Sequence, residues 1–159
     1  EVWHPKLIAF LDLGKGFNCL RKSCCLLQRQ FLRLWAQHGT IQSKMKLRQV
    51  VNELNLEHLC GGDLDSVEVT GGYTSDLMSD VIAKAKKGDV WITNQKHLNI
   101  VAVASLLNLA GVIVAGGLRP DDATIEKAKE ENVSLFVSDL PAFEVVGRLY
   151  NMGLRTNAG

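Results

Sequence analysis

From residue 45 onward, apolar residues alternate between the spacing of strands and the spacing of helices. Short apolar runs, rich in β-branched and aromatic residues, predict strands at 67–72, 90–93, 112–114 and 133–137. Apolar stripes at helical spacing predict helices at 47–54, 77–85, 100–109, from Asp121 or Asp122 to Asn132, and from Pro141 to Gly153. Strands and helices therefore follow one another regularly along this part of the chain.

This alternation predicts the α/β fold class, in which β-α-β crossovers build a three-layer domain. We expect a mostly parallel sheet flanked by helices, because the strands at 112–114 and 133–137 are apolar throughout and suit a sheet covered on both faces. The segment 100–109 is apolar on nearly every side, which predicts a buried helix. A domain of this size can bury a core without disulfides or metals.

Residues 1–44 differ from the domain predicted at 45–159. They hold seven Lys or Arg and two acids (net +5), whereas 45–159 hold eleven Lys or Arg and fifteen acids (net −4). Residues 20–36 have the pattern of a basic amphipathic helix. Three interpretations stay open: a helix for a membrane surface or a partner, a helix packed on the domain, or a non-native or disordered extension translated ahead of Met45.

Charge and cysteine content limit the partners. The net charge of +1 gives no electrostatic case for nucleic acid, and no run of 18 apolar residues or signal peptide is present, so no membrane partner is expected. The four cysteines form no C-x-x-C pair, which favours reduced thiols and a cytoplasmic location. Zinc could be held by Cys19, Cys24, Cys25 and His38, but their spacing is not that of a tetrahedral set. We therefore expect no metal and no cofactor.

Polar and glycine-rich segments follow the predicted strands, at 71–76, 94–97, 116–120 and 138–139. Ligands of open parallel sheets bind beyond the carboxyl ends of the strands, where these segments should meet. The candidate ligand-binding residues are Tyr73, Thr74, Ser75, Asp76, Gln95, His97, Gly116, Gly117 and Arg119.

Two of these groups have simpler interpretations as well. Gly116, Gly117 and Arg119 could bind an anion through backbone N–H groups and a fixed cation, or form a tight turn with a surface arginine. The turn is favoured, because a bare Gly-Gly is a weaker signal than a phosphate loop. Residues 74–76 could hold a ligand, but capping of the following helix is favoured.

No catalytic residue is expected. The sequence contains no G-x-x-x-x-G-K-S/T phosphate loop, no G-x-G-x-x-G after a strand, no G-x-S-x-G and no H-E-x-x-H. His97 has no acid partner close in sequence, which is more typical of a structural or solvated histidine than of a catalytic one. The sequence therefore predicts a binding or regulatory module.

Several short motifs resemble DRTGG-domain proteins, in the same order along the chain. They lie at 69–80, 88–93, 99–104, 115–120 and 140–144, and the resemblance covers about 45–155. It implies an α/β module similar to the N-terminal domain of HPr kinase/phosphorylase, with a regulatory or ligand-binding role. The sequence departs from the family name motif, since Ala115 stands where the family often has Thr, and Lys96-His97 or nearby residues replace Asp-Arg.

The expected function is a regulatory or small-ligand-binding module without catalytic activity, which binds an anionic or nucleotide-like ligand. We also expect a homo-oligomer or an enzyme partner. One alternative is a protein–protein adaptor that modulates a neighbouring metabolic or redox enzyme. Another is a component of an HPr-kinase-like serine phosphorylation system, although the phosphate loop of that kinase lies in a separate domain and is not found in this sequence.

Overall fold

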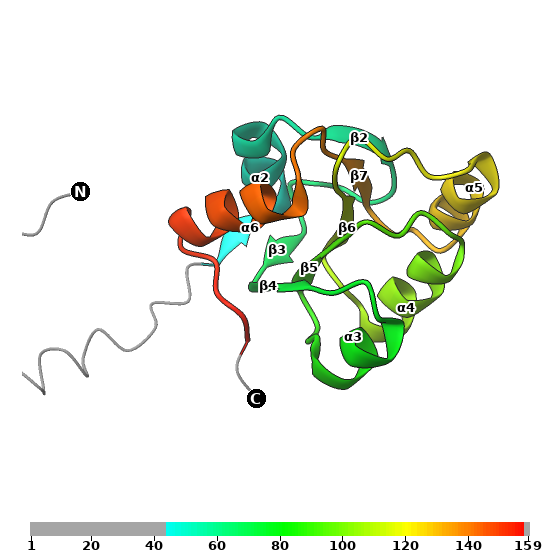
Figure 1. Ribbon diagram of the computed structural model, residues 1–159, viewed down its shortest axis with the longest axis horizontal. Helices are drawn as coiled ribbons and strands as arrows, with labels where there is room; N and C mark the ends of the chain where they lie inside the picture. Colours follow the sequence, from blue (N-terminus) through cyan, green and yellow to red (C-terminus); the bar gives the residue numbers. More distant parts are fainter. Residues whose placement is uncertain (1–43, 158–159) are drawn as a thin grey trace, which may run out of the picture. The chain divides into compact units, whose positions relative to one another are not determined.

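A five-stranded sheet forms the centre of the domain (Figure 1). The computed structural model describes residues 44–157, so the basic segment 20–36 and the cysteine cluster discussed above lie outside the described residues. The strands run in the order β2-β7-β6-β5-β4. Their bounds are β2 Glu57–Cys60, β4 Gly71–Thr74, β5 Asp89–Thr93, β6 Gly111–Val114 and β7 Leu135–Val137. β4 to β7 are parallel and β2 pairs antiparallel with β7, which confirms the mostly parallel sheet.

Helices cover both faces of this sheet, which confirms the three-layer α/β class. α2 (Leu47–Leu54) and α6 (Ala142–Asn151) lie on one face. The other face is covered by α3 (Met78–Lys84), α4 (Asn99–Leu107) and α5 (Asp122–Glu130). The predicted helices therefore form close to their expected positions, and Asn132 takes the left-handed conformation (φ 53°) just beyond α5.

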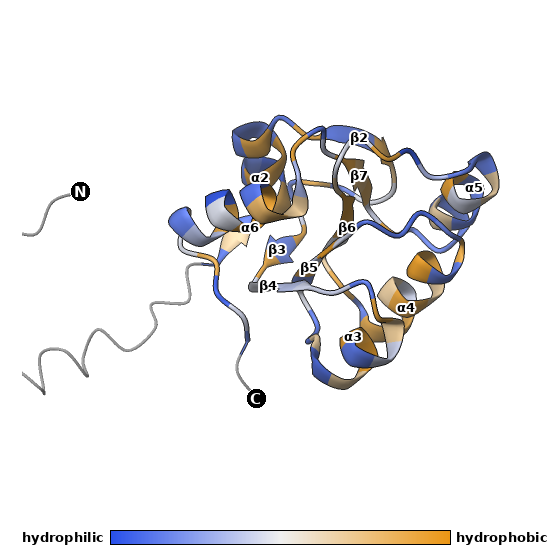
Figure 2. Ribbon diagram, in the orientation of Figure 1, coloured by the Kyte–Doolittle hydropathy of each residue, from blue (hydrophilic) through white to orange (hydrophobic). Residues whose placement is uncertain are grey.

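Alternation along the strands divides the core into two layers. In β5, Val90 and Ile92 pack with α2 and α6, whereas the fully buried Trp91 packs with α3 and α4. β6 and β7 alternate in the same way, with Ile113 and Phe136 on the α2 and α6 side. Figure 2 shows these central strands as mostly apolar, while α2, α5 and α6 carry both polar and apolar residues and α4 is mostly apolar. Both faces of the sheet are thus buried, as continuous apolar strands require.

The bounds predicted for the strand at 67–72 were wrong. Glu68–Val69 form a short strand, β3, which pairs antiparallel with β1 (Met45–Lys46) in a separate two-stranded sheet. The strand that joins the main sheet is β4, which begins at Gly71. Apolar alternation could not reveal β4, because its pairing depends on backbone hydrogen bonds to β5, and two of its four residues are glycines.

Two further features differ from the sequence prediction. β2 was not predicted, since Glu57 and His58 are exposed and its place at the sheet edge depends on pairing with β7. α4 was expected to be buried all round, but Ala102 is exposed and Leu106 is 67% exposed. The apolar pattern predicted the helix correctly, but it did not predict that one side of α4 faces away from the sheet.

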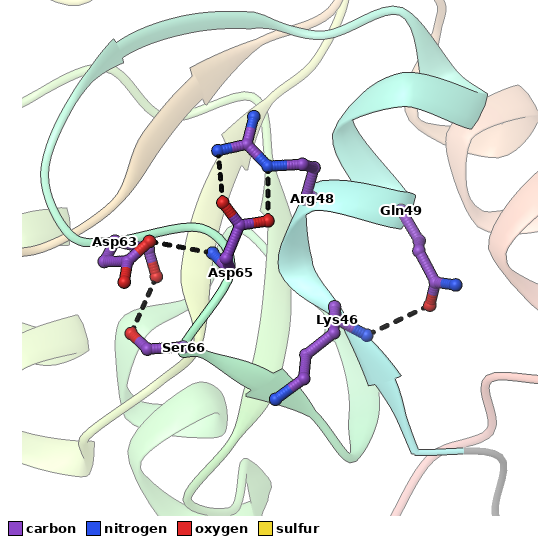
Figure 3. Close-up of polar contacts among 6 residues, drawn as sticks. All are labelled: Lys46, Arg48, Gln49, Asp63, Asp65 and Ser66. Atoms are coloured by element: carbon purple, nitrogen blue, oxygen red, sulfur yellow. Dashed lines mark hydrogen bonds and ion pairs between the residues drawn. The ribbon is translucent and has the colours of Figure 1, made fainter.

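Polar contacts join the start of α2 to the turn before β3 (Figure 3). The guanidinium of Arg48 donates two hydrogen bonds to the carboxylate of Asp65, from Nε at 2.5 Å and from Nη2 at 2.7 Å. These bonds lower the pKa of Asp65 and raise that of Arg48. The backbone N–H of Lys46 donates to the side chain of Gln49 at 3.1 Å, which satisfies one N–H at the start of the helix.

Candidate ligand site at the carboxyl edge of the sheet

The carboxyl ends of the parallel strands β4 to β7 meet at one edge of the sheet. The loops that follow them are residues 75–77, 94–98, 115–121 and 138–141, and we call these loops together the carboxyl rim. Seven of the nine predicted site residues lie in the rim, namely Ser75, Asp76, Gln95, His97, Gly116, Gly117 and Arg119. Tyr73 and Thr74 lie instead within strand β4.

Asp76 ties the first rim loop to the second. Its Oδ1 accepts hydrogen bonds from the Thr93 hydroxyl at 2.6 Å and from the Asn94 backbone N–H at 2.7 Å. Its Oδ2 accepts a third bond from the Asn94 side-chain amide at 3.3 Å. Partial burial acts to raise the pKa of Asp76, but the hydrogen bonds from Thr93 and Asn94 outweigh it and lower the pKa. Asp76 is therefore held as a carboxylate that fixes two loops.

The favoured interpretation of residues 74–76 as a helix cap was wrong. α3 begins after Leu77, and no side chain forms a hydrogen bond that caps it. The Ser75 hydroxyl accepts the Leu77 N–H at 3.2 Å, which makes a local turn. Asp76 points to β5 instead, because the end of that strand supplies three donors. Thr93 and Asn94 were missed as partners, although the signal was a hydroxyl residue at the end of the predicted strand 90–93 followed at once by an asparagine.

A buried tryptophan supports the same loop. The indole N–H of Trp91 donates to the backbone carbonyl of Ser75 at 2.8 Å. The Thr93 hydroxyl also accepts the Gln95 N–H at 3.1 Å, so it serves both the first and the second loop. These contacts attach residues 75–76 and 94–95 to the rigid strand β5. The rim is therefore preorganised on this side.

Gly116 and Gly117 form a closed turn. Both have positive φ values, +75° and +68°, which L side chains rarely adopt. The N–H of Gly116 donates to the Leu140 carbonyl at 2.9 Å, and that of Gly117 donates to the Ser138 carbonyl at 2.8 Å. Because both donors already bind the neighbouring loop, an anion at this turn would have to be held by side chains.

Arg119 supplies such a side chain. Its Nη1 lies 2.9 Å and 3.1 Å from the two carboxylate oxygens of Glu57 on β2. The side chains of Arg119 and Glu57 are 61% and 53% exposed, so water screens the ion pair and it contributes about 0–1 kcal/mol. A ligand with a better acceptor could therefore take the place of Glu57 at little cost.

Of the remaining predicted residues, Gln95 and His97 lie in the rim, whereas Tyr73 contacts helix α3. His97 is exposed in the rim, beside Lys96, whose Nζ lies 3.9 Å from Asp121. Gln95 is half-buried. Tyr73 turns to α3, where its hydroxyl donates to Asp80 at 2.6 Å, and this bond raises the pKa of the phenol. Tyr73 is thus engaged outside the rim.

Three other features of residues 44–157 bear on the chemistry of the domain. Within residues 44–157, no group of three His, Cys, Asp or Glu residues is placed to hold a metal ion. Cys60 is a free, buried thiol whose pKa is raised by burial, which makes it less reactive. In the same part of the chain, no helix is long and apolar enough to cross a membrane.

The fold is an α/β module whose polar and glycine-rich loops lie at the carboxyl edge of a mostly parallel sheet. The chain belongs to the DRTGG domain family, because the profile of that family matches residues 49–152. This match confirms the resemblance found in the sequence over about 45–155. A comparison with curated proteins finds no match.

A solved structure with a similar fold contains the CBS and DRTGG domains of the regulatory region of Clostridium perfringens pyrophosphatase. That structure is a complex with the activator diadenosine tetraphosphate. The TM-score is 0.59 at 19% sequence identity, and the match covers 80% of this chain and 58% of the other. At this identity the similarity shows the fold alone, and this chain spans little more than half of that regulatory region.

Proposed function

We propose that this DRTGG domain is a regulatory module that binds an anionic, nucleotide-like ligand at the carboxyl rim and catalyses no reaction itself. The observation that carries the proposal is the preorganised rim: Asp76 joins the loops after β4 and β5, while the Arg119 guanidinium is exposed farther along the rim, where it pairs with Glu57 of β2. Preorganised loops lower the entropic cost of ligand binding. The rim is also where open parallel sheets bind their ligands.

Arg119 is the main group proposed to bind the anion. One nitrogen of its guanidinium, Nη1, donates to both oxygens of the Glu57 carboxylate. Arginine forms charge-assisted hydrogen bonds of the same kind with phosphate. The exposed Lys96 and His97 lie on an adjacent rim loop and add donors. Because the similar regulatory region was solved with diadenosine tetraphosphate, nucleotides are the first ligands to test.

The test measures nucleotide binding to the full chain by calorimetry and thermal shift. We expect diadenosine tetraphosphate, ATP or AMP to raise the Tm, and Arg119→Gln to weaken binding about tenfold, as the loss of one charge-assisted contact predicts. Arg148→Gln is the matched control, since Arg148 is an exposed arginine of α6 and lies outside the rim. No binding of any nucleotide, or equal binding by the Arg119 and Arg148 variants, would contradict the proposal.

We further propose that the chain forms a homo-oligomer in the cytoplasm. The supporting feature is the apolar side of α4 and its surroundings, where Leu98 is 46% exposed and Leu106 is 67% exposed. Apolar residues that share one helix side are typical of a protein interface. Light scattering should give at least twice the monomer mass, and Leu106→Glu should reduce it. A monomeric mass at high concentration would count against the oligomer.

An enzyme partner and the phosphorylation system stay alternatives. An adaptor would be recovered with a second protein in a pull-down, and a phosphotransfer component would move phosphate from ATP to a protein substrate. No residue of the described chain favours either role over ligand binding.

A further inference from the structure

A second candidate site lies between the edge of the sheet and α6, where Tyr73 and Thr74, two of the ligand-binding residues predicted from the sequence, line it together with Gly72. It is a pocket of about 160 Å³ at β4, and we call it the edge pocket. Strand β4, the second half of α6 and residues 154–156 enclose it. The lining residues that matter here are Gly72, Thr74, Ile92, Leu149, Tyr150 and Arg155.

Gly72 is a glycine that the fold itself does not require. Its φ is not positive, and a Cβ built on it would meet only the Val90 carbonyl at 3.7 Å and an Ile92 methyl at 3.9 Å, which are ordinary contacts. Its neighbour Gly71 differs, since a Cβ there would come within 2.6 Å of Asp89 and 2.7 Å of the Arg155 carbonyl. Glycine within a strand weakens it and often marks the close approach of a ligand. The missing side chain of Gly72 keeps the edge pocket open.

Arg155 places a positive charge at this pocket. Its guanidinium carbon lies 3.5 Å from the centre of the Tyr150 ring. Both hydrogen bonds that its side chain donates come from Nη1, to the carbonyls of Tyr150 at 2.5 Å and Leu154 at 3.0 Å. Arg155 takes part in none of the ion pairs formed within residues 44–157. Nε and Nη2 are therefore available to an anionic ligand.

The volume of the pocket indicates how large the buried part of that ligand can be. A cavity of about 150 Å³ holds one benzene ring, whereas sites for drug-sized molecules measure about 300–1,000 Å³. Ile92 and Leu149 supply apolar walls, and the Thr74 side chain adds a hydroxyl. The space therefore suits a single ring.

We propose that the edge pocket binds a small aromatic acid. The ring of this ligand lies over Gly72 against Ile92 and Leu149, and its carboxylate or phosphate accepts hydrogen bonds from Arg155. Tyr150, with Arg155 stacked on it, holds the guanidinium in place. This site is independent of the proposed function, because it shares no lining residue with the loops of the carboxyl rim.

The test uses amide NMR spectra of the full chain titrated with benzoate and phenyl phosphate. Both probes should shift the Gly72 and Thr74 amide signals, and the neutral isostere benzamide should bind at least tenfold more weakly. Gly72→Val fills the pocket with a residue that suits a strand, and should abolish binding. Gly147→Val is the matched control, since a Cβ at Gly147 meets nothing within 4 Å and Gly147 does not line the pocket.

Arg155→Gln should remove the preference for benzoate over neutral benzamide. Arg119→Gln should leave the binding of aromatic acids unchanged, which would show that this site is separate from the rim. If Gly72→Val does not fold by circular dichroism, Gly72→Ala should still weaken binding severalfold. Equal binding of benzoate and benzamide, undiminished binding by both Gly72 variants, or no shift at millimolar probe would overturn the proposal.

Discussion

The Asp76 carboxylate accepts a hydrogen bond from the Thr93 hydroxyl at 2.6 Å, across the ends of two neighbouring parallel strands. The two residues are 17 positions apart in the chain. Thr93 is buried at the end of β5, whereas Asp76 lies in the loop after β4. This bond transfers the rigidity of the sheet core to the loop where a ligand is proposed to bind.

Asp76→Asn should lower the free energy of unfolding at pH 7 by about 1 kcal/mol, a modest value because the residue is exposed. The folded-state pKa of Asp76 lies below its ordinary value. Its stabilising effect is therefore fully present above about pH 4 and is lost as the pH falls through the folded-state pKa. Urea unfolding at pH 7 and pH 3 should show the difference between variant and wild type shrinking in acid.

Asp139→Asn is the control for this experiment. Asp139 is an exposed aspartate of the same rim, and it forms no hydrogen bond or ion pair within the described residues. Its substitution should change the unfolding free energy by less than about 0.5 kcal/mol. A loss as large as that of Asp76→Asn would mean that rim charge in general, and not the bond to Thr93, stabilises the loops.

The contribution of Asp89 to stability should change with pH in the opposite direction to that of Asp76. The carboxylate is 1% exposed, and burial raises its pKa although the Lys86 N–H and the Asn157 amide donate to it. Its contribution to stability is therefore full below about pH 4 and is lost as the pH rises through the raised folded-state pKa. Asp89→Asn should flatten this dependence in urea unfolding between pH 4 and pH 7.

At pH 7, Asp89→Asn should lose less stability than Asp89→Ala, because its amide oxygen keeps an acceptor for the Lys86 N–H without a buried charge, although its NH2 group cannot accept from the Asn157 amide. Asp89→Ala should cost about 1–3 kcal/mol, since it leaves the buried donors without a partner. If the Asn variant were as unstable as the Ala variant, the charge of Asp89 would be stabilising and the inferred direction of its pKa shift wrong.

Two glycines should give opposite results when changed to alanine. Gly61 has a φ of +92°, and a Cβ there would lie 2.1 Å from the Val133 carbonyl, so Gly61→Ala should destabilise the domain by about 3 kcal/mol or more. Gly147 lies within α6 and has open space around it, so Gly147→Ala should stabilise by about 0.5–1 kcal/mol. Thermal unfolding of both variants checks the pair, and a stable Gly61→Ala would show that the loop relaxes freely.

Local patterns were sufficient for much of the fold. The β-branched run Val112–Val114 gave the right strand, because its side chains meet the core at the period of a strand. The stripe predicted at 143, 146, 149 and 150 gave the right helix, α6, but its buried side was only partly right: Leu149 is buried, whereas Phe143 and Tyr150 are exposed and Val145 is buried instead. The same reasoning predicted that the rim loops converge. It missed β2 and misplaced β4, since an edge strand is held by backbone pairing with a neighbour distant in sequence.

Within the candidate site, the sequence alone determined which residue types follow the strands: Asp76, the Gly116-Gly117 turn and Arg119. Only the tertiary structure decided what each one contacts. Asp76 binds Thr93 rather than capping α3, the glycine N–H groups bind the loop after β7, and Arg119 reaches Glu57, 62 positions away. The reason is physical: residue type and periodicity are local properties, whereas a hydrogen-bond partner is set by which strands lie side by side.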